Sequence, residues 1–190
     1  MKRVIIVHGW GSSPQQDWFP WLEKELKSKG FSVQVPAMPN PEVPVIEAWV
    51  QALSEVVGKL DQDTYFVGHS IGCQTILRYA EKHPTELMGG AVFVAGWFNL
   101  VGLDAEEDPE IAKPWIETPL DFMVVRKVLG TSIAILSDND PYVELEPNKS
   151  IFEGKLGTKV VIENGKGHLS AEDGITELPS ILDAILELSV

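Results

Sequence analysis

The stretch TYFVGHSIG, residues 64–72, decides the fold, because it joins a short apolar run to the helical segment Gln74–Glu81 through a turn bounded by two glycines. A strand, a tight turn and a helix in this order are the setting of the G-x-S-x-G nucleophile elbow. The turn is so tight that the positions two residues before and after Ser70 must lack bulk. The Ser70 hydroxyl then projects at a helix N-terminus, where free N–H groups and the helix dipole favour a developing oxyanion. The alternative is an ordinary turn in which Ser70 caps the helix.

Segments of the same two kinds alternate along the rest of the chain. Apolar, β-branched runs predict strands at Val4–Val7, Phe31–Val35, Thr64–Val67, Ala91–Val94, Ser132–Leu136 and Lys159–Ile162. Segments with helical periodicity lie between them, at Trp18–Ser28, Glu42–Lys59, Ser70–Lys82, Leu145–Glu153 and Ile175–Leu188. Near-continuous apolar strands connected through helices predict a parallel sheet covered on both faces. We therefore expect the α/β class, with a single domain over residues 1–190 built as a three-layer α/β/α sandwich around a mainly parallel sheet of about six strands.

Composition and charge exclude several classes of protein. The 190 residues are 44% hydrophobic and 23% charged, as in an ordinary soluble globule and unlike a disordered or fibrous chain. A single cysteine excludes an internal disulfide and predicts a reducing compartment. The formal net charge of −13 fits poorly with nucleic acid or an anionic membrane as a partner. The N-terminal apolar run is too short for a signal peptide, so we expect a cytoplasmic monomer whose partner is a small-molecule substrate.

The segment 97–129 breaks the alternation. It carries three prolines and no clean period, which predicts an irregular insertion. Between Val101 and Phe122 it holds one basic residue, Lys113, against seven acidic ones: Asp104, Glu106, Glu107, Asp108, Glu110, Glu117 and Asp121. Two interpretations stay open. The insertion is a solvated acidic loop, or it is a partial lid, because it follows the carboxyl end of a strand, where ligand crevices open in sheets of this kind.

A serine nucleophile needs a base, and the chain has four histidines to supply it. His168 lies in the glycine-rich loop NGKGH, residues 164–168, directly after the last predicted strand. Such a loop can hold an imidazole over the carboxyl edge of the sheet, where Ser70 points, so we take His168 as the base. His8, in the first strand–helix loop, and His83, before a proline at a helix end, are expected to be structural.

The acid that orients the base should lie between the serine and the histidine in the chain, after a strand end. The run SDNDPYV, residues 137–143, follows the fifth predicted strand and offers Asp138 and Asp140. Asp140 before a proline also fits a helix N-cap, and Asp138 also fits a plain turn residue. A calcium loop is disfavoured, because Tyr142 stands where a third oxygen ligand is needed and the loop glycine is missing. The residues alone leave both aspartates as candidates.

These residues resemble the α/β-hydrolase superfamily and, within it, the small YdeN-like, retinoblastoma-binding-protein-nine-like serine hydrolases. The likeness spans nearly the whole chain. It rests on the motifs VHGW at 7–10, WFPWL at 18–22, MPNP at 38–41 with Trp49, GHSIG at 68–72, ILR at 76–78, DNDPYV at 138–143, GH at 167–168 and the tail 172–179. The MPNP motif combined with Trp49 is more distinctive than the elbow, which many hydrolases share.

The resemblance implies a compact hydrolase fold without a large cap domain. The family pattern places the acid in an Asp-x-x-Val turn, so the resemblance favours Asp140 over Asp138. It also implies that the backbone N–H groups of Trp10 and Ile71 form the oxyanion hole. The sequence departs from the pattern in two ways: Glu144 stands where a proline often follows the valine, and the insertion has no counterpart.

Together these observations predict a serine hydrolase that cleaves small neutral carboxylic esters or thioesters through an acyl-serine intermediate. Its triad would comprise Ser70, Asp140 and His168. Its substrate site would be lined by Trp10, His69 and Trp97. The acidic insertion disfavours anionic substrates, and no metal or other cofactor is implied. The alternative is a non-catalytic protein-interaction module on a hydrolase scaffold, because fold alone does not determine function.

Overall fold

Six parallel strands form one sheet in the computed structural model, which describes residues 1–103 and 108–190. The strands are β1 (Arg3–Val7), β2 (Ser32–Gln34), β3 (Thr64–His69), β4 (Gly90–Val94), β5 (Ser132–Ser137) and β6 (Lys159–Glu163). Their order is β2-β1-β3-β4-β5-β6, and every neighbouring pair is parallel. All six predicted strands are confirmed, with boundaries shifted by one or two residues.

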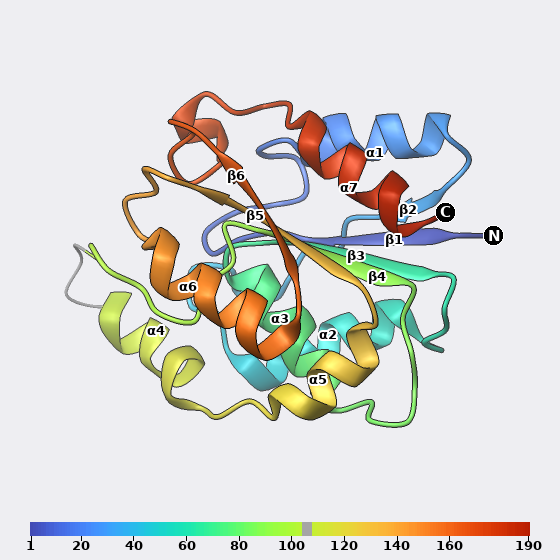
Figure 1. The fold of residues 1–190 in the computed structure, drawn as a ribbon, viewed down its shortest axis with the longest axis horizontal. Coiled ribbons are helices and arrows are strands. Elements are labelled where there is room, and N and C mark those ends of the chain that lie inside the picture. The colour runs from blue at the N-terminus through green and yellow to red at the C-terminus, as the bar shows by residue number, and fades with distance from the viewer. Residues whose placement is uncertain (104–107) are drawn as a thin grey trace.

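Helices cover both faces of the sheet, which confirms the three-layer α/β/α arrangement (Figure 1). One face carries α1 (Phe19–Ser28) and α7 (Pro179–Leu188). The other face carries α2 (Ile46–Val57), α3 (Ile71–Glu81), α5 (Phe122–Leu129), α6 (Leu145–Ile151) and the π-helical turn η1 (Phe152–Leu156). A short 3₁₀ turn, η2 (Ala171–Asp173), precedes α7. Among the helices of the described residues, none has the length and apolar character needed to cross a membrane.

Alternate side chains of the four central strands, β1, β3, β4 and β5, enter two separate apolar cores. In β1, Ile5 and Val7 face the core under α2, α3 and α5, whereas Val4 and Ile6 face the core under α1 and α7. All four side chains are fully buried. This burial on both faces is the reason that the strands read as continuous apolar runs rather than as an alternation with polar residues.

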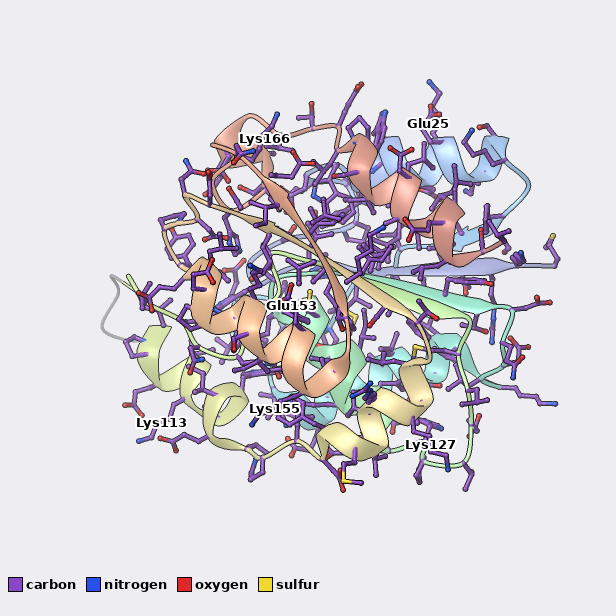
Figure 2. The ribbon with its side chains drawn as sticks, in the orientation of Figure 1. Glu25, Lys113, Lys127, Glu153, Lys155 and Lys166 are labelled. Carbon is purple, nitrogen blue, oxygen red and sulfur yellow. The ribbon has the colours of Figure 1, made fainter. Side chains whose placement is uncertain are left out.

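The expectation of an irregular insertion over 97–129 was wrong for two stretches, which are helical: α4 (Asp108–Glu117) and α5. Asp121 starts α5, because its carboxylate accepts hydrogen bonds from two backbone N–H groups of the first turn. Lys113 on α4 and Lys127 on α5 project away from the sheet (Figure 2). In α4, prolines and acidic side chains interrupt the apolar period that identifies an amphipathic helix, which hid that helix.

α4 packs against the body of the protein rather than standing free of it. Trp115 is 1% exposed, and its indole N–H donates to the carbonyl of Pro44 (3.0 Å). The buried guanidinium of Arg78 on α3 donates to the carbonyls of Trp115 (2.7 Å) and Thr118 (3.0 Å), at the C-terminal end of α4. An apolar anchor and a buried cation therefore fix this helix in place.

The strand order reverses direction at β1, because β2 lies on one side of it and β3 on the other. In open parallel sheets, ligands bind at the carboxyl ends of the strands where the order reverses. The carboxyl end of β1 leads to Gly9 and Trp10, and that of β3 leads to Ser70. The topology therefore brings the first loop and the predicted nucleophile to the same place.

Candidate active site

Ser70 stands between β3 and α3 in a strained backbone conformation, with φ of 53° and ψ of −119°. A left-handed φ is uncommon outside glycine and persists only where the surroundings impose it. The Ser70 N–H donates to the carbonyl of Val94 on β4 (2.9 Å), and the Ser70 carbonyl accepts from the N–H of Cys73 on α3 (3.0 Å). The hydroxyl makes no capping hydrogen bond to the helix. Ser70 therefore has the geometry of a nucleophile elbow rather than that of a capping side chain.

The two glycines of the elbow occupy space that no other residue would fit. A Cβ atom at Gly68 would lie 2.7 Å from the backbone nitrogen of Cys73. One at Gly72 would overlap the carbonyl oxygen of Val7 on β1. The start of α3 thus meets β1 and β3 at backbone contact, which explains the small residues two positions before and after Ser70.

Asp140 and His168 are brought together from two different loops. The distance from His168 Nδ1 to Asp140 Oδ2 is 2.8 Å. The Asp140 side chain is 1% exposed, and its Oδ1 accepts hydrogen bonds from the backbone N–H groups of Tyr142 (2.9 Å) and Val143 (3.0 Å). Because a carboxylate only accepts, Nδ1 carries the proton in this pair, and Nε2 is left as the basic nitrogen of the neutral ring.

Asp138, the other candidate acid, binds backbone instead of the imidazole. Its carboxylate accepts from the N–H of Gly165 (2.7 Å), and the amide oxygen of Asn139 accepts from the N–H of Gly167 (2.9 Å). Both glycines have a left-handed φ, which glycine adopts without strain. Residues 138–140 therefore hold three successive points of the loop that carries the histidine.

The loop after β1 brings Gly9 and Trp10 beside the serine. A Cβ atom at Gly9 would lie 3.6 Å from the Cβ of Ser70, so the backbone passes within contact distance. His8 fixes this loop, since its Nδ1–H donates to the Gly9 carbonyl (2.8 Å) and its Nε2 accepts from the N–H of Met38 (2.9 Å). Burial lowers the pKa of His8, which favours the neutral ring that these two bonds require. These contacts fit the structural role expected of His8.

Two tryptophans flank the serine. Trp97 is 1% exposed, and its Nε1–H donates to Ser70 Oγ (3.3 Å). Trp10 is partly buried, and its Nε1–H donates to the carbonyl of Glu42 (3.0 Å). Among the described residues, the hydrogen bond of the Ser70 hydroxyl is to this indole and not to His168.

His69 lies behind the imidazole of His168 and is 3% exposed. Its Nε2–H donates to the backbone carbonyl of His168 (3.0 Å), and the two ring centroids are 5.2 Å apart. Burial, followed by the nearby His168, lowers the pKa of His69 to about 4, so the ring is neutral near pH 7. Its Nδ1 lies 4.0 Å from the carboxylate of Asp17. His69, which we expected to line the substrate site, does line the cavity. Its Nε2–H, however, points at the loop that carries His168.

A cavity of about 730 Å³ opens at this edge of the sheet, and both Ser70 and His168 line it. An apolar wall consists of Trp97, Leu100, Leu103, Pro141 and Tyr142. A polar wall consists of Ser12, Gln15, Gln16, Asp17, Ser170, Ala171, Glu172, Asp173 and Thr176. The predicted oxyanion residue Trp10 also lines the cavity, whereas Ile71 is buried at the start of α3.

The lining of the cavity is acidic. It includes the carboxylates of Asp17, Glu42, Glu172 and Asp173, and no lysine or arginine is among the lining residues of the described chain. Three acidic residues of the predicted insertion, Asp104, Glu106 and Glu107, lie outside the described residues. Within residues 1–103 and 108–190, no group of three or more His, Cys, Asp and Glu side chains is arranged to hold a metal ion.

Several residues that hold the histidine loop had no predicted role, among them Asn139 and Asp17. The run SDND around Asn139 contains more hydrogen-bonding side chains than one acid requires, which is a usable signal. Asp17 gave no signal, because its Oδ1 accepts from the N–H of Ala171 (2.8 Å), 154 positions away in the chain. His83 lies outside the cavity lining, with Nδ1 3.0 Å from a carboxylate oxygen of Glu86.

The parallel sheet and the elbow that it supports place the protein in the α/β-hydrolase class. Its sequence matches the family model described as serine hydrolase over residues 4–187. The chain therefore belongs to the serine hydrolase family and is a hydrolase. The resemblance to the small YdeN-like and retinoblastoma-binding-protein-nine-like members is confirmed.

Relatives are similar over most of their length. YdeN of Bacillus subtilis (strain 168) is 29% identical over 187 residues, which cover 97% of this chain and 94% of YdeN. Serine hydrolase RBBP9 of Rattus norvegicus is 24% identical over 169 residues, which cover 88% of this chain and 86% of RBBP9. The crystal structure of the Bacillus subtilis ydeN gene product has a TM-score of 0.90 at 28% identity, and the match covers 99% of this chain and 98% of that one.

Proposed function

We propose that the protein is a carboxylesterase that cleaves small neutral carboxylic esters or thioesters through an acyl-serine intermediate. Ser70 is the nucleophile, His168 is the general base, and Asp140 orients the base. The observation that carries the proposal is the 2.8 Å contact between His168 Nδ1 and Asp140 Oδ2 in the cavity that Ser70 lines. That contact leaves the basic Nε2 available to accept the proton of a hydroxyl.

In the acylation step, Ser70 Oγ attacks the ester carbonyl carbon while His168 Nε2 accepts the hydroxyl proton. The imidazolium that forms is stabilised by the buried carboxylate of Asp140. The bond to the leaving alcohol then breaks, and Nε2–H returns the proton to the departing oxygen. The hydroxyl exchanges its contact with Trp97 for one with His168 when substrate binds, since catalytic hydrogen bonds are often poorly aligned in free enzymes.

Two backbone N–H groups stabilise the tetrahedral oxyanion. That of Ile71 begins α3, where the helix dipole favours negative charge, and that of Trp10 follows the glycine in contact with Ser70. Removing one such donor costs about 10²–10³ in rate in enzymes of this kind. In the deacylation step, His168 takes a proton from water, the water oxygen attacks the acyl carbon, and Ser70 Oγ leaves with that proton.

The cavity suggests the substrate class. A volume of about 730 Å³ suits a small ligand, and Trp10 and Trp97 offer aromatic surface to an acyl or alcohol group. The acidic lining repels negative charge. We expect p-nitrophenyl acetate or butyrate to be cleaved faster than a p-nitrophenyl ester whose acyl group carries a carboxylate. A reversed preference would remove the electrostatic argument.

The test is the hydrolysis of p-nitrophenyl butyrate by the wild type and by Ser70→Ala, followed spectrophotometrically. Loss of the nucleophile should lower kcat by about 10⁴–10⁶. Ser150→Ala, at an exposed position on α6, is the matched control and should keep wild-type kcat. A folded Ser70→Ala variant with wild-type activity contradicts the proposal. A wild type that cleaves no ester favours the interaction module instead.

A further inference from the structure

We propose that His69, the residue before the nucleophile, is a positioning residue that sets the place of the general base. It does so by holding the backbone of the segment that carries His168, here called the base loop (residues 164–171). The inference rests on the proposed function, in which His168 is the base. It gives His69 a role that differs from contact with the substrate.

The first step is the direction of the hydrogen bond. A neutral imidazole has one N–H, and the carbonyl of His168 can only accept. The 3.0 Å contact therefore places the His69 proton on Nε2. His69 ends β3 and directly precedes Ser70. One hydrogen bond thus ties the base loop to the residue adjoining the nucleophile, and so controls the separation of the two reacting groups.

The second step is the fixed orientation of the His69 ring. Trp18 and Phe19 lie against it edge-on, with ring centroids 5.9 Å and 6.1 Å away. A Cβ atom at Gly9 would lie 3.1 Å from Nδ1, so the first loop closes over that side. Nδ1 is buried and has no hydrogen-bond partner among the described residues. The ring therefore makes one hydrogen bond within the described residues, and packing directs that N–H at the base loop.

The base loop contains a strained residue next to His168. Leu169, directly after His168, is buried and has a φ of 58°. A leucine keeps a left-handed conformation only where its surroundings impose it. Here the Trp18 Nε1–H donates to the Leu169 carbonyl (3.0 Å), and Asp17 accepts from the N–H of Ala171 (2.8 Å). His69, Trp18 and Asp17 thus hold the backbone on both sides of the strained Leu169, at residues 168–171.

Two substitutions distinguish the effect of the His69 N–H from the effect of the size of its ring. His69→Phe keeps a ring and removes the donor, and His69→Gln keeps a side-chain N–H at similar reach. We expect His69→Phe to lower kcat for p-nitrophenyl butyrate by about 10–100-fold with little change in KM, because a displacement of about 1 Å costs that much. His69→Gln should recover most of the loss. Wild-type kcat in His69→Phe overturns the inference, as does an equal loss in both variants when both keep the wild-type urea midpoint.

A second measurement needs no substrate, so the inference can fail separately from the proposed function. The His168 Nδ1–H held by Asp140 should give a far-downfield proton NMR signal, identified by its absence in His168→Ala. The signal should broaden or vanish in His69→Phe and persist in His69→Gln. An unchanged signal in His69→Phe overturns the inference even if no ester is cleaved. If His69→Phe does not fold, His69→Leu removes the same N–H and should also broaden the signal, and an unchanged signal in that variant overturns the inference.

Discussion

The two sides of the cavity are held by different kinds of contact. The base loop and the polar wall are held by hydrogen bonds from side chains to backbone groups far along the chain. In the base loop, Asn139 accepts from the N–H of Gly167, and His69 donates to the carbonyl of His168. In the polar wall, Asp17 accepts from the N–H of Ala171 and so links the two segments of that wall. Directional contacts of this kind fix the base to within a fraction of an ångström, which proton transfer requires.

The apolar wall is held by packing and by two buried amides, and the first of these is Gln74, whose Nε2–H donates to the carbonyl of Trp97 (2.6 Å). Trp97 is almost fully buried, and the chain after it is fastened by Asn148 of α6, which is 0% exposed. The Asn148 Oδ1 accepts from the N–H groups of Phe98 (2.7 Å) and Asn99 (3.1 Å), and its Nδ2 donates to the carbonyl of Glu144 (2.9 Å). We infer that the hydrogen-bonded side positions the proposed base and that the packed side shapes the space for substrate.

The largest effect on kcat is expected on the hydrogen-bonded side, at residues 138–140. Asp140→Asn should lower kcat by about 10⁴, because the amide no longer favours the tautomer with a basic Nε2 or stabilises the imidazolium. Asp138→Asn is the matched control. It keeps the oxygen that accepts from Gly165, so its kcat should stay within a few-fold of wild type. Steady-state kinetics on p-nitrophenyl butyrate measures both, and equal losses would disprove the division of roles between the two aspartates.

Loosening the apolar wall should lower the free energy of unfolding and raise KM. Asn148→Ala leaves the buried N–H of Phe98 and the part-buried N–H of Asn99 without an acceptor and creates a void, so the free energy of unfolding should fall by about 2–4 kcal/mol. KM should rise more than kcat falls, because the base loop is untouched. Asn99→Ala, whose side chain is exposed, serves as the control. Urea denaturation measures the first effect, and a change below about 1 kcal/mol would show that packing alone holds this wall.

The smallest expected effect is the pH dependence of stability. The pKa values of His8 and His69 lie below 6.5 in the folded protein, that of His69 at about 4. The unfolded chain therefore binds protons that the folded chain does not, so their contribution is complete above pH 6.5 and falls as the pH drops toward 4. In His69→Gln, the loss of unfolding free energy between pH 7.5 and 5 should be smaller than in the wild type by about 1–2 kcal/mol. Urea midpoints at pH 7.5 and 5 test it, and parallel losses in the wild type and the variant would contradict the assignment.

Features that depend on local sequence could be predicted, whereas features that depend on contacts between distant segments could not. Buried parallel strands are apolar runs, and the elbow around Ser70 is a local pattern, so the sheet and the predicted nucleophile were recognisable. α4 was not, because Pro114 and acidic residues interrupt its period and its stability comes from Trp115 and the distant Arg78. The contact of Asp17 with the base loop joins segments that only the fold brings together.

We propose that Ser70 forms a covalent acyl-enzyme in a site activated by His168 and Asp140. The most direct measurement is mass spectrometry of the protein after reaction with a fluorophosphonate, with the labelled peptide sequenced. We expect one adduct, on Ser70, that forms much more slowly in His168→Ala and is absent in Ser70→Ala. An adduct on another residue, or labelling of folded Ser70→Ala at the wild-type rate, would contradict it.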